Sequence, residues 1–69
     1  MPLSGKEVVK VLQKHGFTVS RQKGSHIVLH KFTPKGKLVG IVPNHKEVQK
    51  GTMRSIAKMT EVDRKELGL

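Results

Sequence analysis

The chain has 69 residues and no cysteine, which predicts one small domain over residues 1–69 and excludes disulfides and thiolate–metal sites. Its 14 Lys and Arg against 5 acidic residues give a formal net charge of +9, which attracts polyanions such as nucleic acids and, being spread along the whole chain, does not suit a membrane-surface helix. No apolar run approaches the roughly 18 residues of a membrane span, and the first residues lack the apolar core of a signal peptide, so we expect a cytoplasmic protein.

The first element is a helix predicted over residues 5–15. Ser4 and Glu7 have the spacing of a capping box, in which each side chain accepts a hydrogen bond from the backbone N–H of the other. Apolar residues then recur at helical spacing. Gly16 suits the left-handed position that follows the end of a helix.

Three strands are predicted next. Phe17 and Val19 alternate with polar residues, which indicates a half-buried first strand. Residues 21–25 are predicted to form a turn, and residues 26–32 and 38–42 are predicted to form the second and third strands. Because the connections are short, the strands should form an antiparallel meander.

The second strand has a face that suits the core. Ile27 and Leu29 make the better core pair, so they should point toward the helices. His26 and His30 should then point away from the helices, and Phe32 falls on the same exposed face.

The last part of the chain predicts two more helical segments. A polar, basic loop over residues 44–50 precedes a helix for which Thr52 is the predicted N-cap. Residues 60–63 resemble another cap, followed by a short helix that ends near Leu67. The order α-β-β-β-α, with helices covering one face of a three-stranded antiparallel sheet, predicts an α+β fold like that of double-stranded-RNA-binding domains.

The sharpest candidate for chemistry is Gly24-Ser25-His26. A histidine at the start of a strand, directly after a glycine turn, is held rigidly yet remains open to solvent. Imidazole titrates near neutral pH, so it can take or give a proton during a reaction. The alternative interpretation is an ordinary exposed histidine, and the tripeptide alone favours it.

A second candidate site lies where the second helix begins, at residues 44–46 and 50–52. The free N–H groups of a helix N-terminus bind phosphate, and Lys46, Lys50 and Arg54 gather around this opening. The alternative is a capped helix with a solvated run of charge.

A metal site is not favoured. His26 and His30 are four residues apart, which on a strand is about 13 Å and too far for one metal ion. No paired carboxylates or glycine-rich phosphate loop are evident. We expect neither a metal nor a cofactor, so an enzyme with this sequence would rely on histidine and on cations.

Four motifs, in this order and spacing, resemble the HicA toxin family: Gly16-Phe17, Arg21-x-x-Gly24-Ser25-His26, Val42-Pro43-x-His45 and Lys50-Gly51-Thr52-x-Arg54-x-Ile56. The resemblance covers about residues 4–58. It implies a double-stranded-RNA-binding-like fold and a toxin that cuts messenger RNA without a metal. It also implies a cognate HicB-like antitoxin, and it places the family's catalytic histidine at His26.

A mechanistic hypothesis follows, in which His26 acts as a general base on the 2′-hydroxyl of RNA. The expected RNA-binding residues are Arg21, Lys23, Gly24, Ser25, His45, Lys46, Lys50 and Arg54. Because the sequence has no Tyr or Trp, base stacking on aromatic rings is not expected. The alternatives are a non-catalytic RNA-binding module of the same fold, a DNA-binding regulator and a structural basic protein. We expect the free protein to be a monomer.

Overall fold

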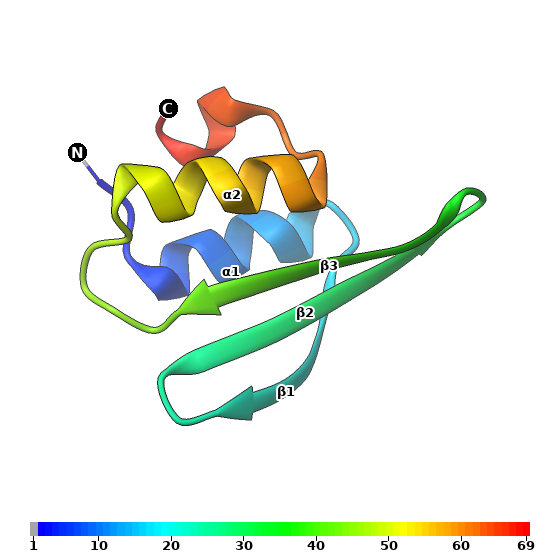
Figure 1. Cartoon of the computed structure of the whole chain (residues 1–69), viewed down its shortest axis with the longest axis horizontal. Coiled ribbons are helices and arrows are strands. Elements are labelled where there is room, and N and C mark those ends of the chain that lie inside the picture. Colours follow the sequence, from blue (N-terminus) through cyan, green and yellow to red (C-terminus); the bar gives the residue numbers. More distant parts are fainter. Residues whose placement is uncertain (1) are drawn as a thin grey trace.

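The computed structural model describes residues 2–69. Its elements, in chain order, are α1 (Gly5–Lys14), β1 (Thr18–Lys23), β2 (His26–Thr33), β3 (Gly36–Pro43), α2 (Lys50–Thr60) and the 3₁₀ helix η1 (Arg64–Leu67). The three strands form an antiparallel sheet in the order β1-β2-β3, and both α-helices lie on one side of it (Figure 1). The expected α+β, double-stranded-RNA-binding-like arrangement is therefore confirmed. None of the helices in the described residues has the length and apolar character needed to cross a membrane.

The signals at both ends of α1 act as predicted. Ser4 Oγ accepts a hydrogen bond from the Glu7 backbone N–H at 3.2 Å, and Glu7 Oε1 accepts one from the Ser4 N–H at 2.9 Å. The helix ends one residue earlier than predicted, with His15 as its C-cap. Gly16 follows with a φ of 90°, a conformation that favours glycine.

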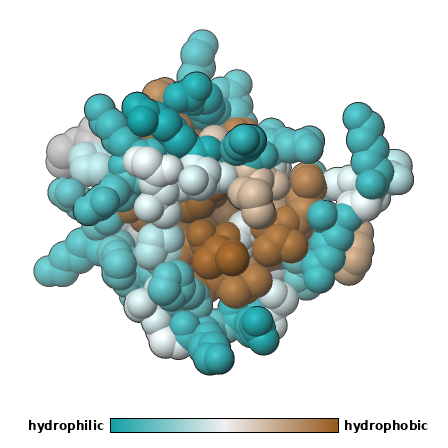
Figure 2. All heavy atoms as spheres, viewed as in Figure 1, coloured by the Kyte–Doolittle hydropathy of each residue, from teal (hydrophilic) through white to brown (hydrophobic). Residues whose placement is uncertain are grey.

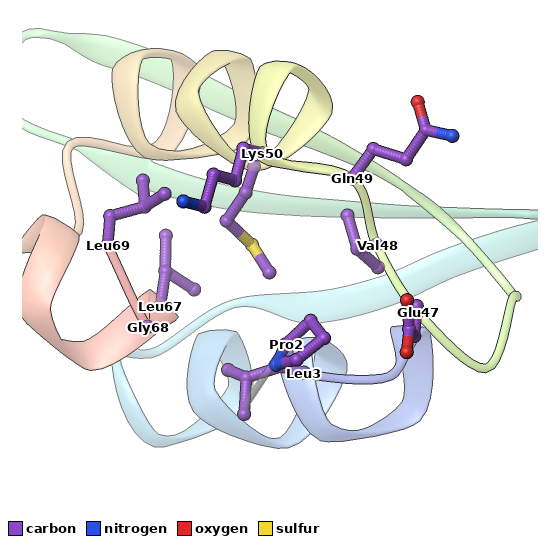
Figure 3. Close-up of a pocket in the computed structure, with 10 residues that line it drawn as sticks. Pro2, Leu3, Glu47, Val48, Gln49, Lys50, Leu67, Gly68 and Leu69 are labelled. Atoms are coloured by element: carbon purple, nitrogen blue, oxygen red, sulfur yellow. The ribbon is translucent and has the colours of Figure 1, made fainter.

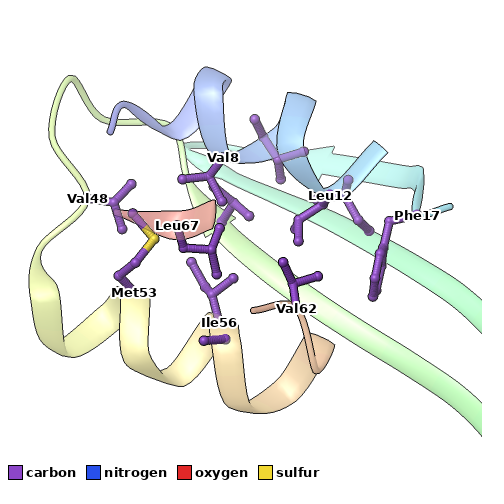
Figure 4. Close-up of a cluster of buried hydrophobic side chains, with 12 residues drawn as sticks. Val8, Leu12, Phe17, Val48, Met53, Ile56, Val62 and Leu67 are labelled. Carbon is purple, nitrogen blue, oxygen red and sulfur yellow. The ribbon is translucent and has the colours of Figure 1, made fainter. Parts of the chain in front are cut away.

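The core lies between the two helices and the side of the sheet that they cover. Ile27, Leu29 and Val42 of the sheet and Val8 and Leu12 of α1 are all buried. Burial of each such side chain contributes about 1.5–3 kcal/mol. Within residues 2–69, the buried apolar residues are Val8, Leu12, Phe17, Ile27, Leu29, Val42, Val48, Met53, Ile56, Ala57, Val62 and Leu67 (Figure 4).

The opposite side of the sheet is open, and we call it the outer face. The strand register assigns to it Thr18, Arg21, Lys23, His26, Val28, His30, Phe32, Lys37, Val39, Ile41 and Pro43. The predicted orientation of β2 is confirmed, because Ile27 and Leu29 are buried while His26 is exposed and His30 is half-buried. The outer face therefore carries the histidine that the sequence singled out.

The first strand differs from its prediction. All six residues of β1 are exposed, and Phe17, which lies just before the strand, is buried instead. The helices pack mainly on β2 and β3, so both sides of β1 face solvent. The strand also continues to Lys23, through residues predicted as a turn. The turn is reduced to Gly24 and Ser25, and Gly24 has a φ of 58° in the first position of a two-residue hairpin loop.

The second helix begins earlier than predicted. It starts at Lys50 with Gln49 as N-cap, so the prediction of Thr52 as the cap was wrong, and Thr52 lies in the first turn. Thr60 was also misread as part of a cap, because it is the buried last residue of α2, while Asp63 caps η1. Thr52 lies within one turn of the start of α2 and Thr60 lies at its end. Near a helix terminus, a threonine hydroxyl can form hydrogen bonds with several backbone groups.

Gly5 provides a test of how closely α1 approaches the chain after β3. A Cβ at Gly5 would overlap the carbonyl oxygen of Pro43, whereas a Cβ at Gly51 would meet no atom within 4 Å. We expect Gly5→Ala to lower the free energy of unfolding by about 1–3 kcal/mol, because backbone must move to admit the methyl group. Gly51→Ala is the matched control and should leave stability unchanged or slightly raised. Denaturant unfolding measures both, and equal stability of the two variants would contradict this close approach.

The capping box of α1 predicts a pH dependence. The hydrogen bond from the Ser4 backbone N–H, assisted by the Ser4 hydroxyl, holds the pKa of Glu7 below its ordinary value of 4.5. A carboxyl whose pKa is lower in the folded state stabilises the fold above its unfolded pKa, and this contribution is lost as pH falls through the folded pKa. Glu7→Gln should therefore lower the melting temperature at neutral pH and reduce its further decrease below about pH 4.5. Thermal unfolding of both proteins over this range measures the effect, and parallel curves would exclude it.

Candidate active site

His26 lines an open pocket at one end of the outer face. The walls come from the end of β3, from the loop over residues 44–49 and from the first turn of α2. The pocket has a volume of about 420 Å³ and is lined by His26, Ile41, Pro43, His45, Glu47, Gln49 and Thr52. The fold thus brings a second imidazole and a carboxylate to the same pocket as His26, from a segment about 20 residues further along the chain.

Backbone hydrogen bonds hold this loop in place. The Asn44 N–H donates to the Ser25 carbonyl oxygen at 2.6 Å, so the loop begins against the turn that precedes the catalytic candidate. The Gly5 N–H donates to the His45 carbonyl oxygen at 2.8 Å, which joins the loop to the start of α1. These bonds fix the chain on both sides of the pocket.

The other end of the loop is anchored in the core. The Val48 side chain is only 2% exposed, and its N–H donates to the Leu3 carbonyl oxygen at 2.9 Å. The loop is therefore tied down near both ends, at residues 44, 45 and 48, although it has no regular secondary structure. Such a segment can present polar side chains at fixed positions.

Positive charge lies on either side of the pocket. On β1, Lys23 is paired with His26 and Arg21 is paired with Val28 in the strand register, and both cations are exposed. Lys46 lies on the other side, in an adjoining hollow lined by Ser4, Lys6, Asn44, His45 and Lys46. Phosphate groups that enter the pocket would meet cations from two directions.

Lys50 and Arg54 are not brought together with His26. They are four residues apart on α2 and share one side of the helix, whereas Thr52, between them, points the other way and lines the His26 pocket. Lys50 lines a larger hollow of about 480 Å³ beside the two chain ends (Figure 3). Arg54 lines a separate hollow with Ala57, Lys58 and Arg64.

Two polar residues of the pocket, Glu47 and Gln49, were not predicted from the sequence. They lie between His45 and Lys50, which were both predicted, but the positive charge of this segment indicated only Lys46 and Lys50. Gln49 is the N-cap of α2 and, among the described residues, makes no side-chain capping hydrogen bond. The partial positive charge of the α2 N-terminus therefore opens beside the pocket, where it favours an anion.

The remaining histidines lie away from this pocket. His15 Nε2 is 2.8 Å from Glu66 Oε2, which joins the end of α1 to η1. His30 lies further along β2, where its ring meets Phe32 edge to face. Over residues 2–69, no three side chains of His, Cys, Asp or Glu are grouped so that they could hold a metal ion. His26 and His45 are the two imidazoles that share the pocket.

Comparison with known proteins agrees with the motifs. A family model described as the HicA toxin of bacterial toxin–antitoxin systems matches residues 5–62. The match runs from the first residue of α1 past the end of α2, and it includes His26 and the loop that carries His45. A search among curated proteins gives no match. Because the family model covers most of the chain, this protein belongs to the HicA toxin family.

Proposed function

We propose that this toxin is a metal-independent endoribonuclease that cleaves messenger RNA, with His26 as its catalytic residue. The observation that carries the proposal is the pocket that His26 and His45 both line, with cations of β1 and of the 44–49 loop beside it. Membership of the HicA family supports a toxin role.

The proposed reaction is a transfer of the phosphodiester to the neighbouring 2′-hydroxyl. The neutral imidazole of His26 takes the proton of that hydroxyl, and the oxygen attacks the adjacent phosphorus. The bond from phosphorus to the 5′-oxygen breaks, which gives a 2′,3′-cyclic phosphate and a free 5′-hydroxyl. His45, which lines the same pocket, or a lysine gives a proton to the leaving oxygen.

The surrounding charges hold the phosphate and stabilise the transition state. Arg21, Lys23 and Lys46 lie around the pocket, and the N-terminus of α2 adds a partial positive charge. Gly24 and Ser25 form the tight turn beside His26, where the backbone can approach a phosphate closely. Lys50 and Arg54 lie on another side of α2, so we propose that they contact RNA beyond the cleaved bond.

An antitoxin would inhibit this site most directly by covering it. A toxin with a formal charge of +9 suits a partner with an acidic surface, because opposite charges accelerate association and align the two proteins. We propose a cognate HicB-like antitoxin that places carboxylates over the His26 pocket. Such a partner would also exclude RNA phosphates from the same cations.

The first test compares the native protein with His26→Ala on a long, unstructured RNA, with EDTA present throughout. We expect cleavage by the native protein and none by the variant, with folding and RNA binding nearly intact, because His26 is an exposed residue. His15→Ala is the matched control, since His15 lies away from the pocket beside Glu66. If neither protein cuts RNA but both bind it in a salt-sensitive way, the protein is a non-catalytic RNA-binding module.

A second test ranks the two histidines of the pocket. We expect His45→Ala to slow cleavage less than His26→Ala does, because a lysine or water can protonate the leaving oxygen while the 2′-hydroxyl still needs its base. Single-turnover rates on RNA measure the ranking, and the reverse order would contradict the assignment.

A DNA strand of the same sequence should remain intact, and its cleavage at an equal rate would exclude attack by the 2′-hydroxyl.

A further inference from the structure

Phe32 is an aromatic ring held in the open on the outer face. The residue is 73% exposed, a larger exposed fraction than that of Val19, Ile41 or Met59, the other large apolar residues at the surface. The His30 ring meets it edge to face, with centroids 5.2 Å apart and an interplanar angle of 70°. Lys37 Nζ lies 6.0 Å from the Phe32 ring centroid. The ring is thus oriented by its neighbours and has a cation beside it.

Phe32 and His26 lie on one line. Alternate residues of β2 point to the same side, so the strand presents His26, Val28, His30 and Phe32 in a row on the outer face. The two ends of this row are six positions apart along the strand, which is about 20 Å. A single strand of nucleic acid a few nucleotides long could follow the row from the pocket to the β2–β3 hairpin.

The charges around this row suit an anionic chain. The sequence has no acidic residue between Glu7 and Glu47, so no strand carries a carboxylate. The outer face instead has Arg21, Lys23 and Lys37. Figure 2 shows a hydrophobic patch over the strands, bordered by hydrophilic side chains. Apolar surface for bases beside cations for phosphates is typical of single-stranded nucleic-acid binding.

We propose that Phe32 stacks on a base of the RNA substrate, and that a single-stranded segment lies along β2 between this ring and His26. This inference rests on the proposed function and adds that the RNA is single-stranded where it binds. A base within a duplex is already stacked on its neighbours and cannot reach the ring, so the segment must be unpaired. Composition argued against stacking because Tyr and Trp are missing, but one exposed phenylalanine on the right face is sufficient for one base.

Binding of a single-stranded RNA oligonucleotide tests this directly. His26→Ala is the background for all variants, so that the RNA stays intact. We expect Phe32→Ala to weaken binding about tenfold, without a change in the salt dependence, because a base contact is lost and no charge is removed. Val19→Ala is the matched control, an exposed apolar residue outside the row, and should bind as the background does. Lys37→Gln should reduce the salt slope by about 1.

Two further measurements report on stacking itself. Because the chain has no Trp, Phe32→Trp provides a single fluorophore at the site, and a stacked base should quench it when RNA is added. An abasic nucleotide is also moved along the oligonucleotide one position at a time. One position should weaken binding in the background protein, and this penalty should disappear in the Phe32→Ala variant, as expected for two partners of one contact.

The outcomes separate this inference from the proposed function. If Phe32→Ala binds RNA as tightly as the background, or weakens only the binding of the antitoxin, the stacking proposal is wrong and the outer face is a protein contact or plain surface. Thermal unfolding of Phe32→Ala should match that of the background, since the ring is mostly exposed. If instead the proposed function is wrong, the native protein will not cleave RNA.

Discussion

The backbone N–H groups of Gly5 and Asn44 donate to carbonyl oxygens of His45 and Ser25, and these two hydrogen bonds set the position of the 44–49 loop. The first requires the close approach that only a glycine at the start of α1 allows. The second joins the loop to the turn before His26. The pocket therefore depends on three segments that are distant in sequence, and its geometry is inseparable from the packing of α1 against the end of β3.

Local signals in the sequence were sufficient to predict most of the fold. The Ser4–Glu7 capping box and the alternation along β2 each depend on neighbouring residues only, so they gave the first helix and the exposed side of His26. The start of α2 was wrong, because Thr52 has the chemistry of a cap but Gln49 occupies that place. This error also affected the prediction of the site. Because Lys50 is already part of the helix, its side chain lies on another side of α2 than Thr52 and does not line the pocket.

Other features depend on contacts that no local pattern records. Phe17 and Val19 have the alternation of a half-buried strand, yet the helices are placed over β2 and β3 and leave β1 uncovered. Glu47 and Gln49 reach the pocket only because the loop is tied down at both ends. The cations on the sheet repel one another, and this repulsion is a cost of the compact state that an anionic partner would relieve.

In the part of the chain that the structure describes, β1 and β3 each pair only with β2, so both are edge strands of the sheet. The unpaired backbone groups of an edge strand are a template for pairing with a strand of another copy of the chain. In β1 the register shifts between Val19 and Arg21, and the strand ends in exposed cations, two features that discourage this kind of self-association. The basic residues of β1 that would hold RNA would therefore also oppose pairing at this edge, and replacing them to abolish RNA binding would remove that protection.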